Sequence, residues 1–148
     1  MPADKPPFNP ERVRRSFAKQ RVMATIGASL DRVEPSAVEI SMPPNASLTQ
    51  QHGYLHAGIV ATIADSACGY AALSLMPDDA AVLSIEFKTN MLAPADGERF
   101  IARGHVIKPG RTIMVCDATV HAVRSGSEKL IATMTGTMMV VQGRGISD

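Results

Sequence analysis

The 148-residue sequence contains no tryptophan, and its aromatic residues are limited to four phenylalanines and two tyrosines. So few aromatic side chains, with no arginine-rich tract, argue against a base-stacking surface for nucleic acid. The formal net charge of +1 also excludes a strong overall field that would attract a polyanion. The sequence therefore predicts no nucleic-acid partner.

Cysteine is scarce as well, and no stretch has the character of a targeting or membrane segment. Cys68 and Cys116 lie in separate apolar runs and form no CxxC motif, which is typical of reduced core thiols. The N-terminal residues include no apolar signal-peptide segment. The longest apolar run, residues 55–76, is interrupted by Asp65 and rich in small residues, which disfavours a membrane span. These features predict a cytoplasmic protein without a membrane partner.

The chain shows no internal repeat, low-complexity tract or linker, and its length suffices for one hydrophobic core. We expect an N-terminal extension with a short helix over residues 1–21 and a single domain over residues 22–148. Prolines at positions 2, 6 and 7 predict a loose or extended start. Asn9 can cap the short helix, with Pro10 in its first turn. Its basic residues form a solvated face or attract an anionic ligand: Arg12, Arg14, Arg15 and Lys19.

The rest of the chain is predicted to form strands around one long helix. Residues 23–35 and 37–43 predict two strands, and residues 57–75 predict a long helix ended by Pro77. Residues 82–92, 99–107, 112–123 and 129–141 predict four further strands, whose short connections favour an antiparallel meander. Only the long helix is apolar enough to cover such a sheet. The predicted fold is therefore α+β, a curved antiparallel sheet wrapped around one central helix.

The first of the four later strands alternates between apolar and polar residues. Its apolar positions are Leu83, Ile85, Phe87 and Met91, and its polar positions are Ser84, Glu86, Lys88 and Asn90. This period of two places Ser84 on the polar face of the strand.

Asp65 is the only charged residue within residues 51–71, in the middle of the long helix. At about 100° per residue, the side chains within about 60° of it are all small: Gly58, Ala61, Thr62, Cys68, Gly69 and Ala72. The bulkier residues form the core-facing stripe: Ile59, Ile63, Tyr70 and Leu73. Small residues let a ligand or another backbone approach closely.

A carboxylate in such a place needs a partner from elsewhere, or it is partly desolvated with a raised pKa. A raised carboxylate pKa favours base chemistry near neutral pH. The structural alternative is a solvated or salt-bridged helical aspartate. Because the helix is apolar nearly all round, we expect the sheet on one side and a second subunit on the other, with the site at a dimer interface.

A metal site is a weaker interpretation of the same region. His52 and His56 are four residues apart and could pair on zinc if both were helical. Gly53 intervenes, however, and no third ligand has a recognisable spacing. We therefore expect no metal.

The segments "QQHGYLHAGIVATIADSACGYAA", "SIEFKTNMLAPADGE" and "VIKPGRT" resemble hotdog-fold acyl-CoA thioesterases of the PaaI-like branch, over residues 22–141. In that family a loop ends in His-Gly-Gly, a long helix follows, and an acidic residue lies nine positions after the histidine. His56 and Asp65 keep this offset. Residues 92–95 match a family segment ending in Pro-Ala, and residues 108–111 match its Lys-x-Gly-Arg turn.

The resemblance implies hydrolysis of an acyl-CoA thioester to a carboxylic acid and free CoA, with no cofactor. It implies a homodimer, generally paired into a homotetramer, with sites between subunits. Asp65 would attack the thioester or activate water, while the backbone N–H beside His56 polarises the carbonyl. The implied catalytic residues are Gln50, His56, Ala57, Gly58, Asp65 and Ser84. The implied substrate contacts are Tyr54, Leu55, Cys68, Gly69, Met91 and Arg111, the last with the CoA phosphates.

Three positions depart from the family pattern or extend it. Ala57 replaces the first glycine of His-Gly-Gly but keeps its N–H, so the oxyanion donor survives if φ is negative there. Gln50 stands where the family often has asparagine. Ser84 matches a serine or threonine that orients water in some relatives, although strand alternation places it on the polar side.

The same fold also hosts non-catalytic acyl-CoA-binding domains, hydratases and dehydratases. The proline-rich histidine motif of the dehydratases is missing here. In the hydratase branch the aspartate precedes the histidine, whereas here His56 precedes Asp65. A thioesterase is therefore the favoured interpretation, and the acyl group is left open because its pocket depends on tertiary packing.

Overall fold

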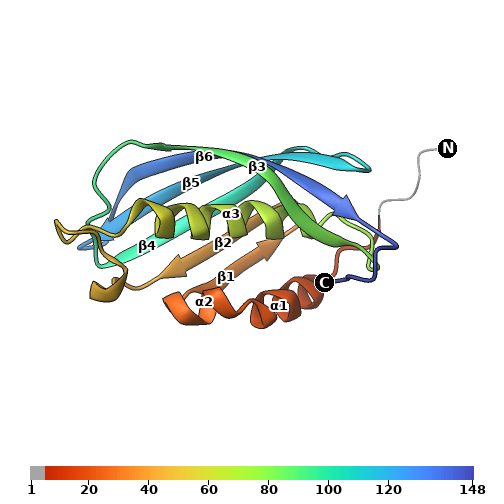
Figure 1. Cartoon of the computed structure of the whole chain (residues 1–148), viewed down its shortest axis with the longest axis horizontal. Helices are drawn as coiled ribbons and strands as arrows, with labels where there is room; N and C mark the ends of the chain where they lie inside the picture. The colour runs from red at the N-terminus through yellow and green to blue at the C-terminus, as the bar shows by residue number, and fades with distance from the viewer. Residues whose placement is uncertain (1–5) are drawn as a thin grey trace.

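The computed structural model describes residues 6–148 and contains one antiparallel six-stranded sheet curved around a long helix (Figure 1). The helices are α1 (Pro10–Lys19), α2 (Arg21–Ile26) and α3 (Ala57–Leu73), with a 3-10 turn at Ala46–Leu48. The strands are β1 (Ser29–Glu34), β2 (Ala37–Met42), β3 (Ala81–Met91), β4 (Arg99–Lys108), β5 (Ile113–Arg124) and β6 (Ser127–Val141). The predicted α+β architecture is confirmed.

The first helix forms as its cap residues predict, but Arg12 is not on a solvated face. The Asn9 side chain accepts a hydrogen bond from the Arg12 backbone N–H at 3.2 Å. Arg12 is only 5% exposed, and its guanidinium donates to the carbonyls of Met76 at 3.0 Å and Ala80 at 2.6 Å. Arg12 thus ties α1 to the connection between α3 and β3, and the prediction of a fully solvated basic face is wrong at this residue.

The predicted strand over residues 23–35 is partly wrong. Residues 23–26 belong to α2, which spans the boundary that we placed between residues 21 and 22. Gly27 ends this helix in the left-handed conformation, with φ +71°. The strand β1 begins only at Ser29.

The four later strands do not form one meander. Strands β4, β5 and β6 pair in sequence, but β4 also pairs with β2, and β3 lies beside β6 at the sheet edge. Strand β4 thereby joins the β1–β2 hairpin to β5 and β6 in one sheet. Within residues 6–148, β3 therefore has one unpaired edge.

Close backbone packing holds α3 against the sheet. A Cβ atom at Gly104 of β4 would lie 2.2 Å from the Ala67 carbonyl oxygen of α3, so only glycine fits there. Of the four residues predicted to face the core, Ile63, Tyr70 and Leu73 are buried, whereas Ile59 is only half-buried. Cys68, Gly69 and Ala72 are buried too, although we grouped them with Asp65, and the half-exposed or exposed small residues are Gly58, Ala61 and Thr62.

Both cysteines are free and buried in this core, as predicted. Burial raises the pKa of the Cys116 thiol to about 12 and also raises that of Cys68, so neither is a reactive thiolate. In the described part of the chain, no helix is long and apolar enough to cross a membrane.

Candidate active site

The beginning of α3 is organised by His56. Its Nδ1 atom accepts a hydrogen bond from the Gly58 backbone N–H at 2.8 Å, which makes His56 the N-cap of the helix. This bond uses Nδ1 of the imidazole as an acceptor for one of the otherwise unpaired N–H groups at the start of the helix. A Cβ atom at Gly58 would approach Nδ1 to 3.1 Å, which explains why glycine suits this position.

Ala57 is the first residue of α3 and retains a usable N–H. Outside glycine, the positive φ angles of residues 6–148 occur at Ser36 and Ser125, so φ at Ala57 is negative. No earlier helical turn exists to accept the Ala57 N–H. The condition under which alanine can replace the family's glycine as an oxyanion donor is therefore met.

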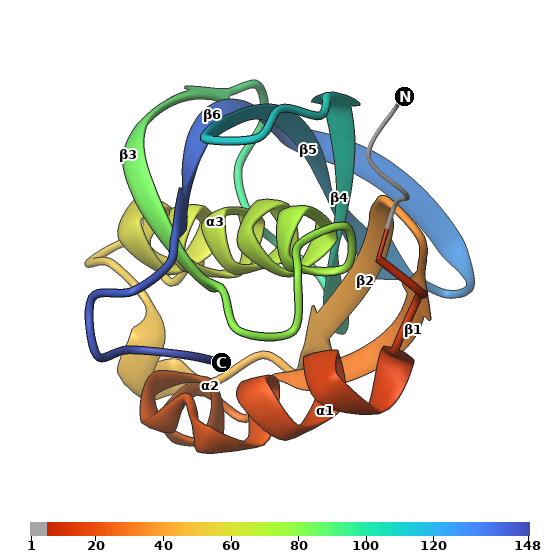
Figure 2. The ribbon, with the colours of Figure 1, turned by 90° about the vertical axis from the view of Figure 1, so that its right-hand side faces the viewer.

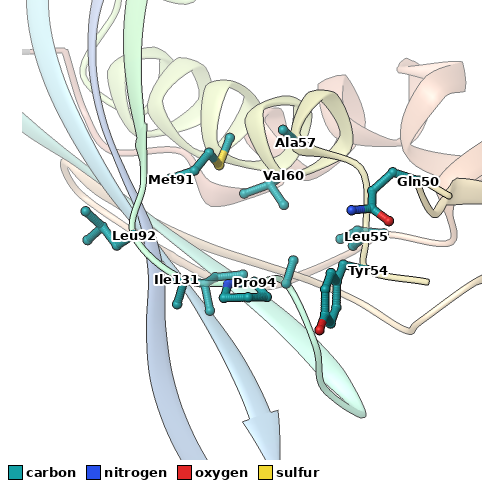
Figure 3. A pocket seen from close by; sticks show the side chains of 11 residues that line it. Gln50, Tyr54, Leu55, Ala57, Val60, Met91, Leu92, Pro94 and Ile131 are labelled. Carbon is teal, nitrogen blue, oxygen red and sulfur yellow. The ribbon is translucent and has the colours of Figure 1, made fainter. Parts of the chain in front are cut away.

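A hollow of about 450 Å³ lies beside Ala57, which is one of the residues that line it (Figure 3). Five of the predicted catalytic or substrate-contact residues line it: Gln50, Tyr54, Leu55, Ala57 and Met91. The other lining residues are apolar and come from α3, the β3–β4 connection and β6: Val60, Leu92, Ala93, Pro94, Ala95 and Ile131. The hollow suits an apolar part of a ligand whose polar atom reaches Ala57.

The loop before α3 holds Gln50 at the rim of this hollow. The Gln50 N–H donates to the Tyr54 carbonyl at 2.9 Å, and the Leu55 N–H donates to the Ala95 carbonyl at 3.0 Å. The Gln50 side-chain oxygen accepts from the His52 N–H, so its amide nitrogen remains as a donor (Figure 3). His52 lies in this turn and not on the helix, and residues 6–148 contain no cluster of three metal-ligating side chains.

Asp65 lies farther along α3 and is half-buried. Its Oδ1 atom accepts a hydrogen bond from the Ser84 hydroxyl at 2.6 Å. Burial raises the pKa of Asp65, and the bond from Ser84 opposes part of that rise. No ion pair to Asp65 occurs in the part of the chain that the structure describes. The expectation of a partly desolvated carboxylate with a raised pKa is confirmed.

Ser84 reaches Asp65 because strand β3 has a bulge, which corrects the predicted alternation. Ser84 is opposite Met138 and Phe87 is opposite Gly136, while Ile85 is the extra residue. The bulge shifts the side-chain period by one, so Ser84 joins Phe87 on the face that looks toward α3. Leu83 consequently points outward and is 51% exposed.

A second hollow, of about 110 Å³, lies beside Asp65. Ser84 and Gly69, both predicted as site residues, line it. Ser66, Tyr70 and Val82 line it as well. Gln20 and Asp148 also line it, and sequence reasoning missed both. They lie in terminal segments far from the motif, and nothing in their local sequence marks them.

The two hollows are separate within one chain. Ala57 and Asp65 are about 12 Å apart along the helix axis, given a rise of 1.5 Å per residue. The hollows share no lining residue. One chain therefore does not bring the Ala57 N–H and the Asp65 carboxylate to the same reacting atom.

Four of the predicted site residues line neither hollow: His56 and Gly58, which flank Ala57, and Cys68 and Arg111, which lie elsewhere in the fold. Cys68 is 0% exposed, in the core. Arg111 is exposed in the β4–β5 turn, whereas α3 begins near Ala95, just before the opposite end of β4. A contact between Arg111 and a ligand at Ala57 of the same chain is therefore not supported by the fold.

Comparison with known proteins bears on these features. A family model described as the thioesterase superfamily matches residues 52–128. A solved thioesterase family protein from Silicibacter pomeroyi is 59% identical, with a TM-score of 0.89 over 90% of this chain and 98% of that chain. The PaaI protein of the E. coli phenylacetic acid degradation operon is 19% identical and has the same fold, with a TM-score of 0.80 over 90% and 93% of the two chains. A 1,4-dihydroxy-2-naphthoyl-CoA hydrolase of Listeria monocytogenes is 25% identical over 81% of this chain and 95% of its own length.

Proposed function

Because this chain belongs to the thioesterase superfamily and is a thioester hydrolase with the hotdog fold, we propose that it hydrolyses acyl-CoA thioesters to a carboxylic acid and free CoA. The observation that carries this proposal is on α3. The helix offers a free N–H at Ala57 and, separately, the partly desolvated carboxylate of Asp65, which accepts a hydrogen bond from Ser84. The reaction of a CoA thioester is named for the Listeria relative, which supports the choice of substrate.

In the proposed mechanism, the Ala57 N–H binds the thioester carbonyl oxygen. Negative charge develops on that oxygen as the carbonyl carbon becomes tetrahedral. The positive end of the α3 dipole adds to the stabilisation, and the Gln50 amide nitrogen is placed to donate a second hydrogen bond. His56 and Gly58 contribute by holding the start of the helix in this geometry.

Asp65 acts on the carbonyl carbon, as nucleophile or as general base. As the base, it accepts a proton from water, whose oxygen bonds to the carbon, and the C–S bond breaks to release CoA thiolate. As the nucleophile, a carboxylate oxygen bonds to the carbonyl carbon and the C–S bond breaks to release CoA thiolate. Water then hydrolyses the resulting anhydride, which releases the carboxylic acid and restores the Asp65 carboxylate. A raised pKa makes the Asp65 carboxylate a stronger base and a stronger nucleophile, so it favours either role. Ser84 is a positioning residue that orients the carboxylate.

The complete site is proposed to form between two copies of the chain, since the Ala57 N–H of one copy must meet Asp65 of another. The unpaired edge of β3 supports such an assembly. Four apolar residues of this strand are about half-exposed: Leu83, Ile85, Phe87 and Met91. Exposed apolar side chains beside an unpaired strand edge are a typical pairing surface. We further propose that dimers pair into tetramers, where Arg111 of another subunit can reach the CoA phosphates.

A thiol-release assay over a panel of acyl-CoA substrates tests the proposed function. We expect steady-state release of CoA by the wild-type protein and its loss in Asp65→Ala. If the wild-type protein binds acyl-CoA without releasing CoA, it is an acyl-CoA-binding domain and the proposal is wrong. If Asp65→Ala hydrolyses as fast as wild type, the role assigned to Asp65 is wrong.

A further inference from the structure

The hollow beside Asp65 is built largely by segments outside the helix. Gln20 comes from the junction of α1 and α2, and Asp148 comes from the segment that follows β6. Figure 2 shows this last segment returning between α3 and the pair α1–α2. The Asp148 carboxylate accepts from the Ser16 hydroxyl at 3.0 Å and from the Val82 N–H at 2.9 Å. These bonds fix the far wall of the hollow.

The hollow is polar, unlike the one at Ala57. Six of its eight lining residues have polar or acidic side chains: Gln20, Asp65, Ser66, Tyr70, Ser84 and Asp148. The Gln20 side-chain oxygen accepts from the Ser66 hydroxyl at 3.1 Å. Among residues 6–148, the Gln20 amide nitrogen has no acceptor, so it is free to donate to a bound group.

The hollow is also small, and a glycine keeps it open. Its volume of about 110 Å³ corresponds to roughly three or four water-sized groups. A Cβ atom at Gly69, one turn of α3 after Asp65, would meet nothing within 4 Å. A short acyl group fits this space, whereas a long alkyl chain does not.

The charges in the hollow exclude an anionic acyl group. Asp65 and Asp148 both line it, and Arg and Lys are missing from its lining. A terminal carboxylate would be repelled by both aspartates and would lose its hydration on entry. A neutral hydroxyl can instead donate to a carboxylate oxygen and accept from the Gln20 amide.

We propose that this hollow receives the far end of the acyl group and selects short acyl groups that end in a neutral hydroxyl. The inference rests on the proposed function, in which Asp65 acts at the carbonyl carbon. An acyl group whose carbonyl is at Asp65 has its next atoms in the adjoining space, between Gly69 and Gln20. The two terminal segments thus determine substrate choice at the site.

Three acyl-CoA substrates of similar size test this selection: 3-hydroxypropionyl-CoA, butyryl-CoA and malonyl-CoA, which differ in the terminal hydroxyl, methyl or carboxylate. We expect kcat/KM to be about 10-fold higher for the hydroxyl than for the methyl, and lowest for the carboxylate. Equal values for the hydroxyl and the methyl, or a preference for the carboxylate, would overturn the inference while leaving the thioesterase intact. Failure to hydrolyse any acyl-CoA would instead overturn the proposed function, and the inference with it.

Gln20→Met removes the free amide and keeps the length of the side chain. We expect it to bring the hydroxyl-to-methyl ratio of kcat/KM close to one. The matched control is Lys19→Met, which places the same side chain on the exposed neighbouring position and keeps the wild-type ratio. An unchanged ratio in Gln20→Met contradicts the inference.

A second variant, Gly69→Ala, narrows the hollow without a steric clash. It should lower kcat/KM for 3-hydroxypropionyl-CoA and for butyryl-CoA relative to kcat/KM for acetyl-CoA.

Discussion

At the scale of single residues, the proposed activity depends on the charge state of the Asp65 carboxyl group. Burial raises the pKa of its carboxyl group, and the hydrogen bond from Ser84 lowers it by stabilising the charged form. Activity requires the charged form, so kcat/KM falls as the pH drops through the pKa of Asp65. That pKa is above the ordinary aspartate value. The fall of kcat/KM on the acid side should therefore occur at a higher pH than an ordinary aspartate would give.

Replacing Ser84 by alanine removes the hydrogen bond that partly offsets the raised pKa of Asp65. We expect the pKa of Asp65 to increase further, so the acid limb of the kcat/KM profile moves to higher pH. Ser84→Thr keeps the hydroxyl and should restore the wild-type profile. A Ser84→Ala profile that only decreases in height, with the limb unmoved, would show that Ser84 does not act through the carboxylate.

The sequence predicted Asp65 better than it predicted Ser84, for a physical reason. The environment of Asp65 follows from the regular geometry of its own helix, where each residue turns by about 100°. The direction of Ser84 depends on a bulge at Ile85, and a bulge without glycine leaves no local signal. Gln20 and Asp148 reach the site only through tertiary packing of the terminal segments.

At the scale of secondary-structure elements, the beginning of α3 decides whether an oxyanion donor exists. His56 caps this helix through Nδ1, and it has no role in proton transfer in our account. His56→Ala should lower the free energy of unfolding by about 1 kcal/mol through loss of the cap. His56→Asn supplies another good cap residue and should restore both stability and activity. If His56→Asn is stable but inactive, the imidazole has a chemical role that a cap does not explain.

The contact between α3 and β4 is the tightest backbone approach that positions the helix. Gly104→Ala would place a Cβ atom 2.2 Å from the Ala67 carbonyl oxygen, so we expect a loss of about 3 kcal/mol or more in unfolding free energy. The control is Gly69→Ala, which meets no atom within 4 Å and should be as stable as wild type or about 1 kcal/mol more stable. Equal thermal midpoints for the two variants, at the same protein concentration, would contradict this packing.

The pairing of elements was less predictable than the elements themselves. The long helix and the four later strands follow from periodicity and turn residues within each segment. The position of β3 beside β6 depends on contacts between residues far apart in sequence, which local patterns do not encode. The helix α2 was missed because its six residues are too few to show a helical period.

At the scale of the whole molecule, we propose that each active site takes Ala57 from one copy and Asp65 from another. Ala57→Pro removes the donor N–H, and proline is well tolerated at the first helical position. The preceding residue, His56, already has extended backbone angles that suit a following proline. Loss of this single donor should lower kcat by about 100- to 1000-fold. Asp65→Asn should be inactive through loss of the carboxylate.

The decisive measurement is the activity of a mixed assembly of Ala57→Pro and Asp65→Asn subunits, formed by co-expression in equal amounts. Each mixed dimer would contain one site with both native groups, so random assembly should restore about a quarter of wild-type activity per subunit. Each variant alone should stay inactive with a near-native thermal midpoint. A mixture as inactive as its separate components would contradict a site shared between copies of the chain.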